Sequence, residues 1–413
     1  MNLRIDLKEW QDISEIPEFK DNPFIPIRSI PPDVKKFIDI VDISPRGVKI
    51  KARDYVGVFP LSDDIILTVS PKAPVEDFLY MFYKAQGIKL DIKDIKKIAQ
   101  AGRKYGIEHP NVFHFLITAL LAELEQLKRL GFLKTSQHVT QDKIIKGKVL
   151  TKETINEWLR GNQQKVVCEK FELSKDNIVN SSIKFTLWSL INMYSNLLGD
   201  EIKNELFKKY LWFKDVSLPK NMSFIEEIEK ILTFRALPNS RSYYYSILNL
   251  CMFFIANSTL EFRSPKRFKV RAFAVYMNKV FENYLYAVLK EQLGYEYRVK
   301  LHPTQQLFDD NNKYSLELDY LILKDDKPVL VVDAKYKSKP VTDDFYQILL
   351  YAEKFGIKNS LLIYPSWGKR TSTEVFRFKE RQVHVMYYDL SDIKKSESTL
   401  REYIYCLVNL KEE

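Results

Sequence analysis

Cysteine, glycine and long apolar segments are all scarce in this chain of 413 residues. The three cysteines, Cys168, Cys251 and Cys406, are far apart and form no CxxC pair, so neither a zinc site nor a disulfide framework is indicated. We therefore expect a reducing compartment, the cytoplasm. The 12 glycines include no GxxxxGKS or GxxxxGKT sequence, which argues against nucleotide binding through a P-loop.

Sequence that could span a membrane is lacking as well. The stretch from Met1 to Phe19 is charged throughout and has no apolar signal core. The longest apolar runs, FHFLITALLAEL and SILNLCMFFIAN, are too short and too polar to cross a bilayer. We expect both runs to form buried helices, and we expect no membrane contact.

Positive charge and length are what the sequence has in quantity. Lysine and arginine number 64 against 54 acidic residues, which gives a net charge of +10. The hydrophobic content of 46% and the charged content of 29% are typical of a globular protein. The basic balance is compatible with a polyanionic partner such as nucleic acid, although it does not determine the fold. A chain of this length predicts two or three domains.

Hydrophobic periodicity divides the chain into three predicted segments. Residues 1–150 are expected to form a β-rich N-terminal domain with helices, because alternating, strand-like patterns extend to about residue 75 and helical patterns follow. One of these helices is expected to end at Gly131 as a C-cap. Residues 151–265 are expected to be a mostly helical middle region. The basic segment 264–273 is interpreted either as the approach to the next domain or as a solvated connector.

The third segment, residues 266–413, is predicted to be a mixed α/β domain with a crossover helix between strands. Thr342 is the predicted N-cap of that crossover helix, with acidic residues in its first turn. The expected elements are a helix over 274–294, a strand over 295–301, a β-hairpin over 316–337, a helix over 342–356, and strands over 359–365 and 382–390.

The hairpin LELDYLILKDDKPVLVVDAKYK carries charged residues where a buried strand should be apolar. Alternation places Asp333 and Lys335 on one face of the second strand, and a turn at KDDKP would bring Asp319 of the first strand beside them. Two carboxylates can hold Mg²⁺, which activates water, and a neighbouring ammonium can orient or deprotonate that water or neutralise developing charge. Phosphodiester hydrolysis needs these parts, although a surface ion pair of little energetic value has the same spacing.

Two flanking helices offer further polar residues. Glu282 lies at the flank of an apolar stripe that begins with Phe273 and Met277, where it could reach a metal site. Gln347 and Tyr351 are four residues apart and so face the same way, where they could orient a water or contact a phosphate. The alternatives are a solvated glutamate and a helix face that packs on the sheet.

The order of these residues resembles the PD-(D/E)XK nuclease superfamily in its RecB-like form with a QxxxY helix. The resemblance implies a restriction-endonuclease-like fold for the C-terminal domain. Leu318 stands before Asp319 where many members have proline. The matching residues are Glu282, Asp319, Asp333, Ala334, Lys335, Gln347 and Tyr351.

Three further segments narrow the resemblance to the McrC family. They are YVGVFPLSDDIILTVSPKAP, GKVLTKETI and VCEKFELSKDNIVNSSIK, and the likeness extends from about Tyr55 onward. It implies the nuclease subunit of a modification-dependent McrBC restriction system. The implied partner is McrB, a hexameric AAA+ GTPase that carries the DNA-reading domain. In the family the N-terminal part of McrC docks in the ring and stimulates GTP hydrolysis, and two nuclease domains meet to cut both strands of DNA.

The resemblance also implies roles for individual residues. Asp319 and Asp333 would bind Mg²⁺, for which Mn²⁺ could substitute, with Glu282 and the carbonyl of Ala334 as further ligands. Lys335 would activate the water or stabilise the transition state. Gln347 and Tyr351 are carried over as the positioning pair.

Two alternative functions and one further residue stay open. The chain could be a related nuclease of another defence or repair system with a different motor, or a non-cutting activator of its partner's NTPase. No helix-turn-helix, zinc finger or aromatic cage is evident, so recognition of the modified base is expected to lie in a partner. Lys72, in the predicted docking domain, is either an interface residue or a lysine held in a turn.

Overall fold

The computed structural model describes residues 3–62, 64–88, 95, 111–141, 145–195, 197–258, 272–308, 310, 313–368 and 371–409. Contacts divide the chain into two compact units. Unit 1 contains Met1–Leu116, Asn257–Thr259 and Arg271–Glu413, and unit 2 contains Ile117–Ala256 and Leu260–Val270. This division differs from the three predicted segments 1–150, 151–265 and 266–413, because both ends of the chain fold together in unit 1. The basic segment 264–273 lies outside the described residues up to position 271.

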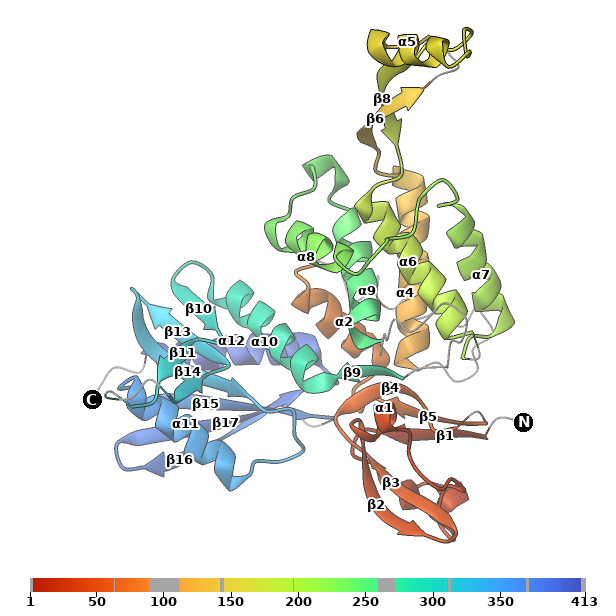
Figure 1. Ribbon diagram of the computed structural model, residues 1–413. Coiled ribbons are helices and arrows are strands. Elements are labelled where there is room, and N and C mark those ends of the chain that lie inside the picture. Colours follow the sequence, from red (N-terminus) through yellow and green to blue (C-terminus); the bar gives the residue numbers. More distant parts are fainter. Residues whose placement is uncertain are drawn as a thin grey trace. The chain divides into compact units, whose positions relative to one another are not determined.

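A four-stranded sheet in unit 1 joins the N-terminal strands to residues 273–276, which precede α10 (Met277–Leu293). Its order is β1-β5-β4-β9, with β9 paired antiparallel to β4 (Figure 1). Gly57 in β4 has a φ of +148°, and a Cβ there would lie 1.9 Å from the carbonyl oxygen of Phe273. Only glycine allows this close approach. The four strands are β1 (Leu3–Lys8), β5 (Ile65–Ser70), β4 (Tyr55–Pro60) and β9 (Phe273–Tyr276).

Strand β9 corrects one prediction. The sequence interpretation began a helix at residue 274 and placed Phe273 on its apolar stripe, whereas the helix α10 spans Met277–Leu293. Phe273 and Val275 are buried in the sheet instead. Pairing with β4 decides the conformation here, because a short apolar run can satisfy either period.

The other N-terminal elements complete the β-rich region predicted before residue 75. Strands β2 and β3 form an antiparallel hairpin. Buried side chains from these strands and the four-stranded sheet share one hydrophobic core, which includes Ile5, Ile50 and Leu67. The remaining elements are η1 (Ile13–Glu15), η2 (Pro17–Phe19), α1 (Pro32–Lys35), β2 (Ile38–Ser44), β3 (Gly47–Ala52) and α2 (Val75–Ala85).

The C-terminal part of unit 1 is built on a six-stranded mixed sheet, which confirms the mixed α/β prediction. Its order is β10-β13-β14-β15-β17-β16; β14, β15 and β17 are parallel and the other pairs antiparallel. Helix α11 (Thr342–Lys354) connects the parallel strands β14 and β15, as a crossover must. The strands are β10 (Tyr297–Leu301), β13 (Tyr320–Lys324), β14 (Lys327–Ala334), β15 (Asn359–Ser366), β16 (Ser372–Phe378) and β17 (Arg381–Asp389).

Helices cover both faces of this sheet. Val331 of β14 packs in a core with Ile348 and Tyr351 of α11. Tyr320 of β13 points to the opposite face of the sheet. Its hydroxyl donates a hydrogen bond of 2.7 Å to the carbonyl of Glu282 in α10. The end of β14 is therefore enclosed between α10 and α11. A further helix, α12 (Ile393–Asn409), was not predicted.

The hairpin turns where it was predicted to turn. Asp325 and Asp326 both have positive φ values, 49° and 59°, which is the conformation that a two-residue hairpin loop requires. Strand β11 (Thr304–Gln306) was not predicted. The first strand of the predicted hairpin is interrupted: β12 (Ser315–Glu317) pairs with β11, and β13 begins at Tyr320. Because β12 ends at residue 317, Asp319 lies between two strands.

The predicted N-cap of α11 is wrong by one residue. Val341 occupies the N-cap position, and its backbone N–H donates to Oδ2 of Asp344 at 3.2 Å. Thr342 is the first helical residue. The acidic first turn was predicted correctly.

Unit 2 contains the predicted helical region and a projecting arm. Helix α4 (Val112–Leu130) ends at Gly131, which has a φ of +96°, as expected for a C-cap. The other helices of this region are α6 (Ile178–Met193), α7 (Asp200–Leu211), α8 (Phe224–Phe234), η3 (Asn239–Arg241) and α9 (Tyr244–Asn257). Among the described helices, none combines the length and the apolar character needed to cross a membrane.

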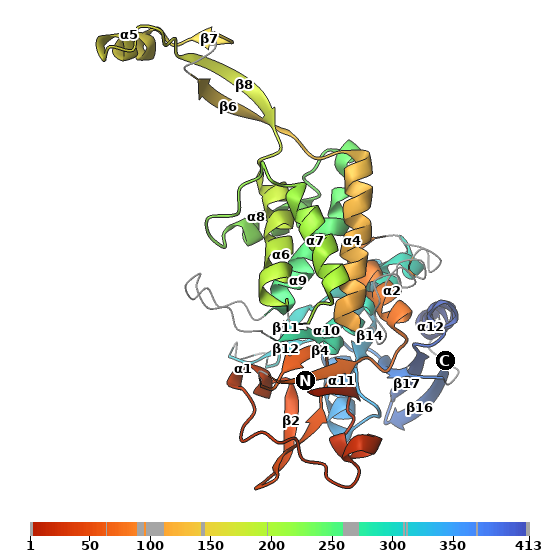
Figure 2. The same cartoon turned by 90° about the vertical axis from the view of Figure 1, so that its right-hand side faces the viewer.

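The arm is a small sheet that carries one helix. Strands β6 and β8 form a long antiparallel pair, β7 adds two residues to β8, and α5 lies at the far end (Figure 2). Large apolar side chains are exposed on the arm, including Leu159 at 80% and Leu173 at 72%. The arm consists of β6 (Thr135–Gln141), β7 (Lys148–Val149), α5 (Thr151–Leu159) and β8 (Cys168–Ser174).

Candidate functional site

Asp319 is held at the end of β14 by backbone hydrogen bonds. Its Oδ2 accepts a hydrogen bond of 2.8 Å from the N–H of Ala334, and its carbonyl accepts one of 3.0 Å from the N–H of His302. Burial raises the pKa of Asp319, opposed by the Ala334 hydrogen bond and the charge of Lys335. The predicted meeting of Asp319 with the end of the second hairpin strand is therefore seen in the structure.

Asp333 and Lys335 form a largely buried ion pair beside Asp319. Asp333 is 1% exposed, and its Oδ2 lies 2.8 Å from Nζ of Lys335. Burial, followed by the negative charge of Asp319, raises the pKa of Asp333 to about 7, against the effect of Lys335. Burial alone would lower the pKa of Lys335, but the nearby carboxylates outweigh it and the net shift is upward. Lys335 is therefore an ammonium at neutral pH in this structure.

The polar pair on α11 fixes the position of this ammonium. Lys335 donates to Oε1 of Gln347 at 2.9 Å, and Nε2 of Gln347 donates to the Tyr351 hydroxyl at 2.6 Å. The hydroxyl in turn donates to the carbonyl of Glu317 at 2.7 Å. Both ends of the Gln347 amide are thus bonded within the protein, and the chain of bonds connects Lys335 to the end of β12.

Glu282 reaches the site from α10, as predicted, and meets a residue that sequence reasoning missed. Its Oε1 lies 2.7 Å from Nε2 of His302. Glu282, His302 and Asp319 each offer one ligand atom, and these three atoms lie within 4.8 Å of one another. His302 could not be singled out from the sequence, because one histidine after a strand is a common occurrence and its distance from Glu282 depends on the tertiary fold.

The donor set fits a divalent metal ion. Oε1 of Glu282, Nε2 of His302 and Oδ1 of Asp333 are buried atoms without hydrogen-bond partners among the described residues. Buried polar atoms of this kind are costly unless a ligand satisfies them. Carboxylates suit Mg²⁺ and Mn²⁺, and the imidazole adds a nitrogen donor. Asp333 is not one of the three clustered residues. The N–H of Ala334 donates a hydrogen bond to Asp319.

A second buried carboxyl connects the N-terminal strands to the strand end that carries Lys335. Oε2 of Glu9 accepts hydrogen bonds from the N–H of Lys72 at 2.9 Å and from the Tyr336 hydroxyl at 3.0 Å. The ammonium of Lys72 lies over the rings of Trp10 and Trp367, at 4.8 and 5.2 Å from their centroids. Lys72 thus has its partners inside unit 1, which suits the turn interpretation better than the interface interpretation.

The buried carboxyl of Glu9 should make the thermal stability of the chain depend on pH. Burial raises the pKa of Glu9 from 4.5 to about 8. A group with a raised folded-state pKa contributes stability that is complete below pH 4.5 and is lost as the pH rises through 8. We expect Glu9→Gln to flatten the fall in Tm between pH 5 and 8.5, measured by thermal unfolding. Glu18→Gln, at an exposed position, should keep the wild-type slope. Equal slopes in all three proteins would contradict the prediction.

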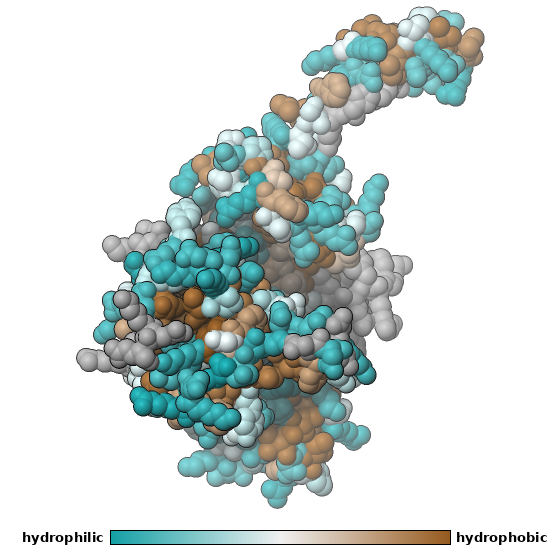
Figure 3. All heavy atoms as spheres, turned by 90° about the vertical axis from the view of Figure 1, so that its left-hand side faces the viewer, coloured by the Kyte–Doolittle hydropathy of each residue, from teal (hydrophilic) through white to brown (hydrophobic). Residues whose placement is uncertain are grey.

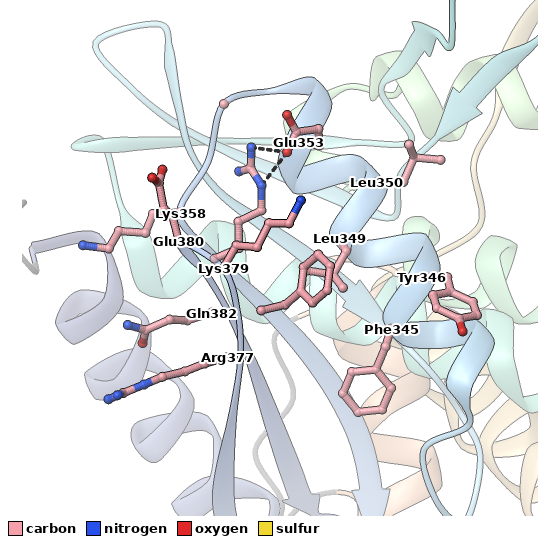
Figure 4. A pocket seen from close by; sticks show the side chains of 13 residues that line it. Phe345, Tyr346, Leu349, Leu350, Glu353, Lys358, Arg377, Lys379, Glu380 and Gln382 are labelled. Atoms are coloured by element: carbon pink, nitrogen blue, oxygen red, sulfur yellow. Dashed lines mark hydrogen bonds and ion pairs between the residues drawn. The ribbon is translucent and has the colours of Figure 1, made fainter.

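A separate groove lies between α11 and the β16–β17 hairpin (Figure 4). Its lining includes apolar side chains of α11, among them Phe345 and Leu349, and basic side chains of the hairpin such as Arg377. Nε of Arg381 donates to Oε2 of Glu353 at 2.8 Å. Arg381 begins β17, whereas Asp333 is near the end of β14, and these strands run in the same direction. The groove therefore lies at the opposite end of the parallel strands from Asp333 and is separate from the site.

Comparisons with known proteins agree with this architecture. The family model described as "McrBC 5-methylcytosine restriction system component" matches residues 50–365. A chain of the refined half-complex from the tetradecameric assembly of Thermococcus gammatolerans McrB AAA+ hexamers with bound McrC is 20% identical, with a TM-score of 0.66, over 98% of this chain and 100% of that chain.

A second solved structure and the curated proteins add little. A chain of the cryo-EM structure of the Thermococcus gammatolerans McrBC complex is 20% identical with a TM-score of 0.47, over 70% of this chain and 88% of that chain. No curated protein matches. The first structural likeness shows a shared fold, and the family model covers well over half of the sequence. The chain therefore belongs to the McrBC family of 5-methylcytosine restriction system components, as its resemblance to McrC predicted.

Proposed function

We propose that this chain is the metal-dependent DNA endonuclease subunit of an McrBC-type restriction system. The observation that carries the proposal is the convergence of Asp319, Asp333 and Lys335 at one end of β14, with Glu282 arriving from α10. Membership of the family makes a restriction role the context for this chemistry. The C-terminal sheet with its crossover helix is then a PD-(D/E)XK nuclease fold, a proposal supported by the order of its elements and its site residues.

Each residue has a chemical task in this proposal. Glu282 and Asp319 would hold Mg²⁺ or Mn²⁺, with Asp333 and the carbonyl of Ala334 completing the ligands. The bound ion would activate water and neutralise phosphate charge. Lys335, kept protonated by its neighbours, stabilises the negative charge that develops on the phosphate. Gln347 and Tyr351 hold that ammonium in place.

The proposed partner is an McrB-like AAA+ GTPase hexamer whose GTP hydrolysis this chain stimulates. The solved chain with the same fold comes from a complex of McrB hexamers with McrC. The sequence has no P-loop of its own, so a motor must come from elsewhere. We propose the arm of unit 2 as the docking element instead of the β-rich N-terminal domain. Figure 3 displays apolar residues at the tip of the arm, and exposed apolar surface of this kind marks interaction sites.

Double-stranded DNA is the proposed substrate, and cutting both strands would require two copies of the site. The net charge of +10 favours contact with a polyanion. The edge strand β16 exposes Val375, Phe376 and Phe378, which offers an apolar surface for a second copy. Dimerisation through this part of unit 1 remains a prediction.

The decisive experiment combines this chain with the AAA+ protein encoded beside it. We expect the two proteins to co-purify and to cut DNA containing 5-methylcytosine when GTP and Mg²⁺ are present, and to leave unmethylated DNA intact. GTPase stimulation without any cutting would support the non-cutting activator instead. Cutting that needs a different motor and ignores methylation would support the alternative defence or repair nuclease.

A further inference from the structure

We propose that His302 is a ligand of the metal ion through Nε2, and that its imidazole makes the site prefer Mn²⁺ over Mg²⁺. The inference deepens the proposed function and rests on it for the presence of a metal. It names a residue outside the seven positions that carry the family resemblance.

The backbone fixes His302 next to Asp319. His302 follows β10 with a φ of +48°, a left-handed conformation that costs free energy for a residue other than glycine. Its N–H donates to the carbonyl of Asp319 at 3.0 Å, and the N–H of Leu318 donates to the carbonyl of Pro303 at 3.3 Å. These two hydrogen bonds hold the segment around His302 against the segment around Asp319, and so stabilise the unfavourable backbone conformation of His302.

The ring of His302 is oriented by two carboxylates on opposite sides. Its Nδ1 lies 3.6 Å from Oε1 of Glu317, and its Nε2 lies 2.7 Å from Oε1 of Glu282. These two contacts fix the orientation of the ring, with Nε2 on the side of Glu282 and Asp319.

The short contact between Glu282 and His302 does not have hydrogen-bond geometry. Neither Oε1 of Glu282 nor Nε2 of His302 has a hydrogen-bond partner among the described residues, although the atoms are 2.7 Å apart. These two atoms and one carboxylate oxygen of Asp319 lie within 4.8 Å of one another, close enough to surround one ion. A protonated imidazole paired with Glu282 is the competing arrangement, and it would repel a metal ion.

The ligand types determine which ion is preferred. Mg²⁺ takes oxygen ligands almost exclusively, whereas imidazole nitrogen suits transition metals. Two carboxylates with one imidazole therefore favour Mn²⁺, which accepts both donor types. Removing the imidazole should weaken Mn²⁺ binding by about 10-fold or more and change Mg²⁺ binding much less.

The test measures metal binding directly, in the full chain without partner or DNA. Isothermal titration with Mn²⁺ and with Mg²⁺ should give tighter Mn²⁺ binding for the wild type, and His302→Gln should remove most of that difference. Pulsed EPR of the Mn²⁺-loaded wild type should reveal coupling to ¹⁴N, and this coupling should disappear in His302→Gln. Gln305→Ala, an exposed neutral position three residues away, is the matched control and should behave as the wild type.

The outcomes separate this inference from the proposed function. Absence of nitrogen coupling in the wild type, or its persistence in His302→Gln, would overturn the inference even if the complex cuts DNA. Nitrogen coupling in a chain that never cuts DNA would support the ligand and refute the nuclease. If His302→Gln unfolds, His302→Asp and wild type labelled with ¹⁵N-histidine test the same claim, because ¹⁵N labelling changes the coupling without altering the chain.

Discussion

Asp333→Asn is expected to lower the rate of DNA cleavage by about 1,000-fold or more while leaving the proposed complex with the AAA+ partner intact. Asparagine has nearly the same size, so the substitution removes the charge and keeps the packing. The charge matters because the carboxyl lies at the end of β14 between Asp319 and the ammonium of Lys335. A neutral amide would neither attract a divalent cation nor hold that ammonium.

Lys335→Met tests the other half of the same ion pair. The loss of cleavage should be similar, because the ammonium that faces the phosphate is gone. Its effect on stability should differ from that of Asp333→Asn, since Lys335→Met leaves a 1% exposed carboxyl without its cation. We expect the Tm of Lys335→Met to fall more at pH 8 than at pH 5, because protonation at low pH relieves the uncompensated charge.

The assay for both variants is cleavage of 5-methylcytosine-containing DNA with the partner, GTP and Mg²⁺, alongside size-exclusion analysis of the complex. Asp343→Asn is the matched control, because Asp343 is an exposed acid in the first turn of α11 and is outside the site. It should cut at the wild-type rate. Wild-type cleavage by Asp333→Asn or by Lys335→Met would refute the assignment of the site.

Local patterns predicted the hairpin and the crossover helix well. Asp325 and Asp326 form the expected turn, and Asp333 and Lys335 lie side by side, as the alternation of the strand predicted. These features depend on neighbours in sequence, because turn conformation and strand alternation are properties of a few consecutive residues. The four-residue spacing of Gln347 and Tyr351 was enough to predict that their side chains lie together, because residues one helical turn apart share a face.

Features that depend on distant partners were missed. Phe273 fits a helical stripe, and only the close approach of β4 at Gly57 makes it part of a strand. His302 joins the site because β10 ends beside α10 and its backbone binds Asp319. The core that Ala272 and Ala274 share with the N-terminal strands is a tertiary property of the same kind. No local periodicity encodes these pairings, because their partners are tens to hundreds of residues away.

The arm provides the second large expected effect. The double variant Leu159→Gln and Leu173→Gln should weaken binding to the AAA+ partner by about 100-fold, because burying one leucine side chain contributes about 1.5–3 kcal/mol and each 1.4 kcal/mol is a factor of ten. Both leucines are more than two-thirds exposed, so their replacement costs the folded chain little. Stimulated GTP hydrolysis and partner-dependent cleavage should fall together with binding.

Leu211→Gln is the matched control for the arm, since Leu211 is a half-exposed leucine of unit 2 outside the arm, on α7. It should bind the partner normally. Binding can be measured by biolayer interferometry with the immobilised chain, and circular dichroism should give the same Tm for all proteins. If the double variant binds as tightly as Leu211→Gln, the docking surface is elsewhere, and the β-rich N-terminal domain becomes the next candidate. Together with Asp333→Asn, which should bind without cutting, the arm variant would assign partner binding and phosphodiester hydrolysis to different units of the chain.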